Sequence, residues 1–294
     1  MELPYPGKFV SFNGFGPDAY ATDGVLGLED PAYARRILCE GDSWFTIGAV
    51  PSSNLLYPLR FAQSTLLVSL ARPGDTIRNM CDIAANPTLK QLIAQQNFAV
   101  KWDAIFISGG GNDLIDKASN IICRPSAGAG QHMLDYINMI DLTNFKRDIM
   151  RGYFKIAELR QGSVNEKTPI VTHVYDYPTP RDAKSKFLGF KVGGPWLYPA
   201  FKQHDVPEAF WISLTDFIFE ALASTLVELS FKIPHFHTIS NTREVLTRAR
   251  LGTTESDGDW LNEIHPTQSG YEKLSRVISP ELNALATGTH PDLC

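Results

Sequence analysis

Ile37-Leu38-Cys39-Glu40-Gly41-Asp42-Ser43-Trp44 is the stretch that decides the fold. A short apolar run ends in a glycine and passes at once into a polar turn, which is typical of a strand buried on both faces of a parallel sheet. Further apolar runs recur along the chain at 66–70, 104–107, 170–174 and, more weakly, 235–239. The pattern therefore predicts five buried strands that run mostly parallel.

Segments with helical patterning separate these runs, near 76–95, 133–161, 208–230 and 267–286. Strands that alternate with helices predict the α/β class, as a three-layer α/β/α sandwich around a mostly parallel five-stranded sheet. In open sheets of this kind, ligands bind outside the carboxyl ends of the strands. Several polar and glycine-rich blocks of this sequence directly follow those ends.

The rest of the chain divides into an arm, a domain and an insertion. Residues 1–33 are rich in glycine, proline and aromatic residues without clear periodicity, and we expect an irregular arm packed on the domain. Residues 34–294 form the expected domain, because a chain of 294 residues, 44% of them hydrophobic, suffices for one α/β core. Within it, 179–211 is too rich in glycine and proline for a helix and too apolar for a linker, which indicates a lid or binding loop.

Charge and hydropathy argue against several classes of function. The net charge is −5 and the pI about 5.8, so no broad cationic surface for nucleic acid is expected. The longest apolar stretch, 210–231, contains Asp216, Glu220 and Glu228, which indicates a buried helix rather than an integral membrane segment. The first residues lack the pattern of a signal peptide, which favours a cytoplasmic protein.

The four cysteines, Cys39, Cys81, Cys123 and Cys294, are far apart and have no metal-ligand spacing with histidine. We therefore expect reduced thiols and no metal site. A disulfide between Cys81 and Cys123 stays open, because spacing alone does not exclude it.

Two of the blocks follow the first two predicted strands. Ser43 lies on a tight turn, where a serine can present its Oγ above the sheet as a nucleophile. In isolation, a Gly-Asp-Ser triplet is more often a plain turn with a helix cap. Gly74, after the second strand, is in isolation an ordinary turn glycine. Its functional interpretation is a residue without Cβ whose N–H can approach a reacting carbonyl oxygen.

Two more blocks lie further along the chain. Gly109-Gly110-Gly111-Asn112-Asp113 follows the third predicted strand, and the Asn112 amide can donate a hydrogen bond to a developing oxyanion. A phosphate loop is the competing use of the glycines, but no Gly-Lys-Ser/Thr follows and GxGxxG is absent. His265 precedes Pro266, which suits a first helical turn, so the histidine lies on the loop before the last helix. A lone histidine there is more often a surface or capping residue.

In this order, the serine, glycine, asparagine and histidine blocks resemble those that name the SGNH hydrolases, the superfamily of GDSL-like lipases and esterases. The resemblance spans about 34–278 and is carried by motifs rather than by the segments between them. The GxSxG elbow is absent, which argues against the α/β-hydrolase superfamily.

The resemblance implies a flavodoxin-like SGNH fold and acyl transfer to water through an acyl-enzyme, without metal or organic cofactor. It implies that Ser43 is the nucleophile and that His265 acts as general base and then as acid. The oxyanion hole would consist of the Ser43 and Gly74 N–H groups and the Asn112 side-chain amide.

The chain departs from the family pattern at two positions. Trp44 replaces the leucine of GDSL and is expected to pack beneath the turn, and Asn262 stands where the family has the triad aspartate. An amide can orient His265 but cannot stabilise an imidazolium as a carboxylate does. Asp259 or Glu263 would then supply the charge, Asn262 or a main-chain carbonyl would only orient the base, or the protein would be catalytically weakened. We favour a dyad or an Asn-assisted triad.

Three hypotheses compete for the function. The leading one is a carboxylic ester hydrolase in which the insertion forms an apolar wall, with Trp44, Trp196 and Tyr198 as candidate substrate contacts. The second is a carbohydrate O-acetylesterase, because Trp196, Tyr198 and Trp211 could equally stack on sugars. The third is a binding module that has lost catalysis at Asn262. The expected partner is a small-molecule, lipid or carbohydrate ester, and the oligomeric state stays open.

Overall fold

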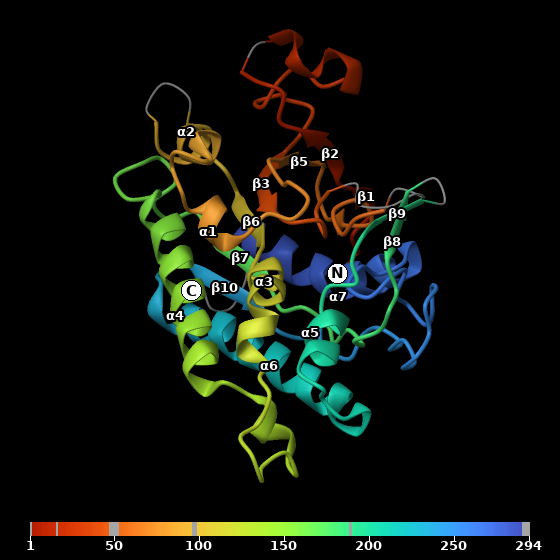
Figure 1. Cartoon of the computed structure of the whole chain (residues 1–294). Coiled ribbons are helices and arrows are strands. Elements are labelled where there is room, and N and C mark those ends of the chain that lie inside the picture. Colours follow the sequence, from red (N-terminus) through yellow and green to blue (C-terminus); the bar gives the residue numbers. More distant parts are fainter. Residues whose placement is uncertain (1, 16, 47–52, 96–98, 188–189, 290–294) are drawn as a thin grey trace.

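The central element of the computed structural model is a six-stranded parallel sheet in the order β10-β7-β6-β3-β5-β2. The structure describes the whole chain except residues 1, 16, 47–52, 96–98, 188–189 and 290–294. The strands are β2 (Lys8–Ser11), β3 (Arg35–Gly41), β5 (Thr65–Ser69), β6 (Ala104–Ser108), β7 (Ile170–His173) and β10 (Phe236–Ile239). Helices flank this sheet, and the predicted α/β/α class is confirmed (Figure 1).

The order of the strands places a ligand site between β3 and β6. Without β2, the order β5-β3-β6-β7-β10 is the 2-1-3-4-5 arrangement of flavodoxin-like folds. The strand order reverses between β3 and β6, and ligands bind at such a switch point. Gly41 ends β3 because a Cβ there would lie 2.9 Å from the Ser108 carbonyl oxygen. The block with Ser43 and the glycine block at 109–111 follow these two strands.

The sixth strand comes from the N-terminal arm. Lys8–Ser11 pairs in parallel with β5 at the edge of the sheet, so the arm is not irregular throughout and the prediction of five strands is one short. Only Val10 of this strand is fully buried, and such a short apolar run does not stand out in the sequence. The arm also contains β1 (Tyr5–Pro6), which pairs with β4 (Arg60–Phe61), and a 3₁₀ helix at Pro17–Asp23.

The α-helices of the described chain are α1 (Ile77–Met80), α2 (Pro87–Ala94), α3 (Gly111–Ile121), α4 (Met139–Glu158), α5 (Tyr198–Gln203), α6 (Trp211–Lys232) and α7 (Gln268–Thr287). The prediction of one helix over 76–95 is wrong. Asn86 caps a second helix and Pro87 occupies its first turn, and proline fits there but not in a helix interior.

Two helices differ from the prediction. The sequence predicts no helix at α3, which begins within the glycine block and carries buried Leu114 and Ala118 toward the core. The helix expected from 133 begins at Met139, because Asn138 accepts hydrogen bonds from the first-turn N–H groups and a 3₁₀ turn, Met133–Tyr136, precedes it.

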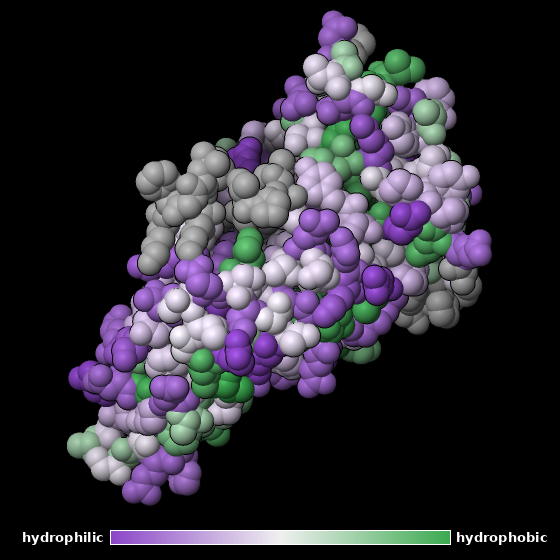
Figure 2. All heavy atoms as spheres, turned by 90° about the vertical axis from the view of Figure 1, so that its right-hand side faces the viewer, coloured by the Kyte–Doolittle hydropathy of each residue, from purple (hydrophilic) through white to green (hydrophobic). Residues whose placement is uncertain are grey.

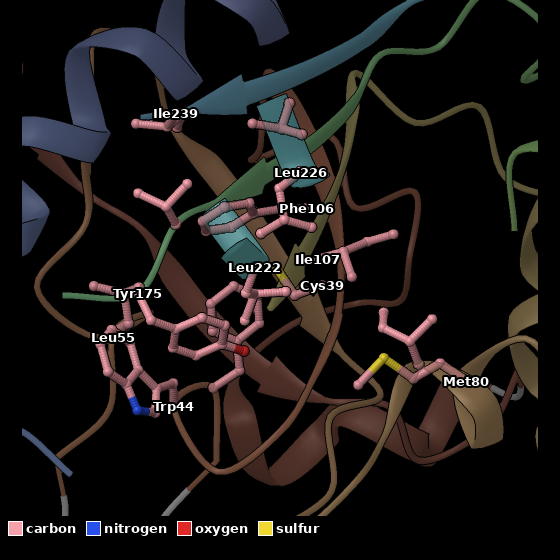
Figure 3. Packing of buried hydrophobic residues seen from close by; sticks show 14 of the residues in the cluster. Cys39, Trp44, Leu55, Met80, Phe106, Ile107, Tyr175, Leu222, Leu226 and Ile239 are labelled. Carbon is pink, nitrogen blue, oxygen red and sulfur yellow. The ribbon is translucent and has the colours of Figure 1, made fainter. Parts of the chain in front are cut away.

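Helix α6 is long and apolar enough to cross a membrane by length and composition, yet half of its most apolar stretch is buried inside the protein. It lies against α4 and β10, and its Leu222 and Leu226 belong to the same core cluster as Phe106 and Ile107 of β6 (Figure 3). On the described part of the face seen in Figure 2, hydrophobic side chains are dispersed among hydrophilic ones. The buried half of this stretch of α6 therefore packs in the core.

The insertion is a hairpin followed by a short helix. Strands β8 (Ser185–Phe187) and β9 (Phe190–Gly193) pair antiparallel, and α5 and a 3₁₀ turn at Glu208–Phe210 lead into α6. The segment therefore has its own secondary structure.

The cysteines that the structure describes, Cys39, Cys81 and Cys123, are all free thiols. Cys81 and Cys123 are therefore not joined, and Cys294 lies outside the described residues.

Candidate active site

Three of the four predicted blocks meet at the carboxyl end of the sheet. Ser43 follows β3, Asn112 lies in the first turn of α3 after β6, and both border one small cavity. His265, on the loop before α7, reaches Ser43 from the far end of the chain, because its Nε2 lies 2.7 Å from the Ser43 Oγ. The fourth, Gly74, lies in the turn after β5.

The other ring nitrogen of His265 faces Asn262. The Asn262 Oδ1 lies 3.0 Å from His265 Nδ1 and also accepts hydrogen bonds from the N–H groups of Ile264, at 3.1 Å, and His265, at 2.9 Å. Because two main-chain donors point at this oxygen, a flipped amide would bring its NH₂ against them, so the orientation is determined. An oxygen that only accepts requires a proton on Nδ1, which leaves Nε2 free to accept the proton of Ser43.

Neither His265 nor Asn262 carries a charge near neutral pH. Burial lowers the pKa of His265 to about 4, so the imidazole is neutral near neutral pH. The Asn262 Nδ2 is buried and has no hydrogen-bond partner among the described residues. Behind His265, the described residues therefore offer a neutral amide and no carboxylate.

The three N–H groups expected to form an oxyanion hole belong to Ser43, Gly74 and the Asn112 side chain. Within the described chain, neither the Ser43 nor the Gly74 N–H has a partner in the turn and loop hydrogen bonds. Gly74 has a φ of +76°, which favours glycine, and its neighbour Asp75 donates its own N–H to Arg72. The Asn112 amide donates to the Asp75 carbonyl at 2.9 Å, which orients this side chain. One amide hydrogen of Asn112 remains for a ligand.

The glycines of the third block are explained by packing. A Cβ on Gly109 would lie 2.4 Å from the Ile77 side chain, and a Cβ on Gly111 would lie 3.0 Å from the Tyr175 ring. Gly110 has a φ of +108°. The block lets α3 begin close to the sheet, which is what places Asn112 beside Ser43.

A buried polar network that the sequence analysis missed lies beneath Ser43. The Asp42 carboxylate accepts hydrogen bonds from the Trp44 N–H at 3.0 Å, the Ser108 hydroxyl at 3.1 Å and the Tyr175 hydroxyl at 2.6 Å. The Ser108 hydroxyl also lies 3.1 Å from His173 Nε2. Burial raises the pKa of Asp42 to about 6. Ser108 and His173 end β6 and β7, and Tyr175 follows β7. In the sequence, each is a polar residue at or near the end of an apolar run.

Trp44 joins the turn that holds Ser43, the proposed nucleophile turn, to the loop that holds His265, the proposed base loop. Its ring is buried, stacks on His173 with centroids 5.6 Å apart, and meets the edge of Tyr175 (Figure 3). Its Nε1 donates to the Ile264 carbonyl at 3.1 Å. Trp44 thus packs beneath the turn and forms one wall of the cavity.

The two carboxylates considered as substitute acids direct their hydrogen bonds elsewhere. Asp259 accepts from the Thr247 N–H and forms an ion pair with Lys273 at 2.6 Å. Glu263 is buried and accepts from main-chain N–H groups of Arg181 and of the insertion, those of residues 196–198. Burial raises the pKa of Glu263 to about 7. Neither residue stands behind His265, and Glu263 instead anchors the insertion to the base loop.

That anchor brings one aromatic residue of the insertion to the site. The half-buried Trp196 meets the His265 ring edge-on, with centroids 5.4 Å apart. Tyr198 instead packs against Trp211, with centroids 5.6 Å apart, and both belong to the scaffold of the insertion. No group of three or more His, Cys, Asp or Glu residues in the described chain could hold a metal ion.

Comparison with known proteins finds likeness only among solved structures. No family model matches the chain, and neither does any curated protein. The similar structures include phospholipase A1 from Streptomyces albidoflavus NA297, at 14% identity, a TM-score of 0.47 and coverage of 85% of this chain and 99% of that one. A carbohydrate acetylesterase family member from Sinorhizobium meliloti has 14% identity, a TM-score of 0.46 and coverage of 86% and 99%.

A third structure is the salicylyl-acyltransferase SsfX3 from a tetracycline biosynthetic pathway, at 16% identity and a TM-score of 0.45. The match covers 88% of this chain but only 57% of the acyltransferase. Likenesses at this level of identity and TM-score carry no argument about activity. Any such argument rests on the strand order and the side-chain geometry of this chain. The strand order is flavodoxin-like, as the resemblance to the SGNH hydrolases implies, and His265 lies beside Ser43.

Proposed function

We propose that this chain is a serine hydrolase that cleaves carboxylic esters through an acyl-enzyme on Ser43. The observation that carries the proposal is the 2.7 Å contact between the Ser43 Oγ and the His265 Nε2. A hydroxyl within hydrogen-bond reach of a neutral imidazole, with that imidazole oriented by a third group, is the arrangement that activates a serine.

In the first half-reaction, the Ser43 Oγ forms a bond to the acyl carbon while its proton passes to His265 Nε2. The carbonyl oxygen becomes an oxyanion, for which the N–H groups of Ser43 and Gly74 and the Asn112 amide are the proposed donors. The bond to the alcohol oxygen then breaks, and the proton on Nε2 passes to that oxygen. The products are a free alcohol and an acyl-Ser43 ester.

In the second half-reaction, water adds to the acyl-Ser43 ester. His265 accepts a proton from the water, the second tetrahedral intermediate forms at the same donors, and the bond to Ser43 Oγ breaks. The proton returns from His265 to Ser43, and a carboxylic acid leaves. Proton and charge balance over the cycle without a metal or cofactor.

Asn262 is compatible with this cycle because of how it is held. In serine proteases, an amide at this position costs about 10⁴ in turnover because it selects the wrong imidazole tautomer. Here the main-chain N–H groups of Ile264 and His265 fix the amide oxygen toward Nδ1, which favours the productive tautomer. What Asn262 lacks is charge, so the imidazolium formed in the transition state is stabilised less than beside a carboxylate.

The proposal is tested by hydrolysis of p-nitrophenyl acetate. We expect the wild-type protein to release p-nitrophenol well above the buffer rate and Ser43→Ala to lower kcat/KM by at least about 10³-fold. Ser224→Ala, which removes an exposed serine of α6, is the matched control and should leave activity unchanged. Equal rates for the wild-type protein and Ser43→Ala would support the binding module instead.

A further inference from the structure

A small cavity lies beside the proposed nucleophile, between α3, α6 and the loop after β7. Its volume is about 20 Å³, and Ser43 and Asn112 border it. The apolar part of its wall includes Ile115 on α3, Phe219 on α6, Trp44, Pro178, Trp260 and Ile264. The cavity therefore begins at the reacting atoms and leads into an apolar interior.

The charged residues of this wall are already committed within the protein. The Asp42 carboxylate is occupied by the network beneath Ser43. The Asp176 carboxylate accepts hydrogen bonds from the N–H groups of Tyr177 and of residues 244–246. A group that enters the cavity meets apolar surface, so the cavity favours an uncharged hydrocarbon group.

The position of His265 decides which half of an ester enters. The base must protonate the alcohol oxygen, so the alcohol departs on the His265 side, where Trp196 stands. The cavity is bordered by Ser43 and Asn112, whereas His265 is not among its lining residues. The acyl substituent, on the opposite side of the carbonyl carbon, is therefore the part that enters the cavity.

The size of the cavity limits the acyl substituent. A volume of about 20 Å³ is far below the 390 to 640 Å³ of three other hollows of the described chain, so the cavity favours a short substituent such as a methyl. Phe219 is buried within a 22-residue helix that packs on α4 and β10, so this wall does not move aside cheaply. Each additional methylene has to displace packed side chains.

We infer that the acyl group this site cleaves is acetyl, with its methyl in the cavity formed by Ile115, Phe219 and Trp260. The inference rests on the proposed serine hydrolase function and adds its substrate class. The wall excludes longer acyl chains, whereas the alcohol lies outside the cavity, on the side where Trp196 meets His265.

The test compares p-nitrophenyl acetate, butyrate and octanoate, which share one leaving group and differ only in the acyl chain. We expect kcat/KM to fall by at least about tenfold from acetate to butyrate, and further for octanoate. A kcat/KM that stays level or rises with chain length would overturn the inference, while hydrolysis that depends on Ser43 would leave the proposed function intact. No hydrolysis of any ester, with no labelling of Ser43 by a fluorophosphonate, would overturn both.

Two variants assign the selectivity to the wall. Phe219→Ala and, separately, Ile115→Ala should raise the ratio of butyrate to acetate kcat/KM by about tenfold, because each opens the end of the cavity. Phe217→Ala, on the same helix but outside the lining, is the matched control. Ile115 is only partly buried, so its variant decides the question if Phe219→Ala does not fold. An unchanged ratio in a folded Ile115→Ala protein would contradict the assignment.

Discussion

The nucleophile turn and the base loop are both buried, but they are held in different ways. Beneath Ser43, the Asp42 carboxylate is satisfied by hydrogen bonds from Trp44, Ser108 and Tyr175. Behind His265, the Asn262 oxygen is saturated while its Nδ2 has no partner among the described residues. A carboxylate therefore organises the turn of the proposed nucleophile, whereas only a neutral amide orients the proposed base.

This asymmetry has a consequence for pH. Burial with no carboxylate alongside lowers the pKa of His265 to about 4. A base must be neutral to act, so we expect activity above this pKa and its loss as the pH falls through it. In the proposed hydrolase, an amide at 262 would extend the active range into acid and would stabilise the imidazolium less than a carboxylate.

The largest effect is expected from removing the base. His265→Ala should lower kcat/KM for p-nitrophenyl acetate by about 10⁴-fold or more, because no other described side chain contacts the Ser43 Oγ to accept its proton. His204→Ala, far from the site, is the control, since its Nε2 contacts only the Ser119 carbonyl. Retention of a tenth or more of the activity in His265→Ala would show that another group acts as base.

A smaller effect, in the opposite direction, is expected from Asn262→Asp. The carboxylate would stabilise the imidazolium, so kcat should rise by about 10- to 100-fold. The same charge raises the pKa of His265, so the acid limb of kcat/KM should move from near pH 4 toward neutral pH.

The measurement for this variant is kcat/KM against pH in both proteins, over the range in which both stay folded. Asn120→Asp, at an exposed position of α3, adds the same charge away from the site and should leave the profile unchanged. An acid limb at the same pH in the wild-type protein and Asn262→Asp would show that Asn262 does not govern the base.

The smallest effect is expected on the nucleophile side. Tyr175→Phe removes the 2.6 Å hydrogen bond to the buried Asp42 carboxylate and should lower the free energy of unfolding by about 1–3 kcal/mol in urea titrations. Tyr5→Phe, at an exposed tyrosine, should change it little. The acid limb of kcat/KM should not move in Tyr175→Phe, and a shift like that of Asn262→Asp would mean that the two regions are not independent.

Much of the fold and of the site could be predicted because their signals are local. Short sequence blocks mark the strand ends and contain Ser43, Asn112 and His265. The sequence also shows that Asn262 stands where the family pattern has an aspartate. The network of Ser108, His173 and Tyr175 could not be predicted, because it joins β6, β7 and the first block, which are far apart in sequence.

Two other features escaped prediction for the same reason. Glu263 is a candidate acid because it lies close to His265 in the sequence. Its carboxylate instead accepts hydrogen bonds from an insertion about 65 residues away, which the local sequence does not reveal. Strand β2 is stabilised by pairing with β5 rather than by its own apolar residues. Long-range pairing leaves no periodic signal in the segments that take part.

The central claim, that Ser43 is an activated nucleophile, is tested most directly by intact-mass spectrometry after treatment with a fluorophosphonate. We expect each wild-type chain to gain one phosphonyl group, peptide mapping to locate it on Ser43, and Ser43→Ala and His265→Ala to gain none. A wild-type protein that stays unlabelled, or one labelled equally in Ser43→Ala, would contradict it.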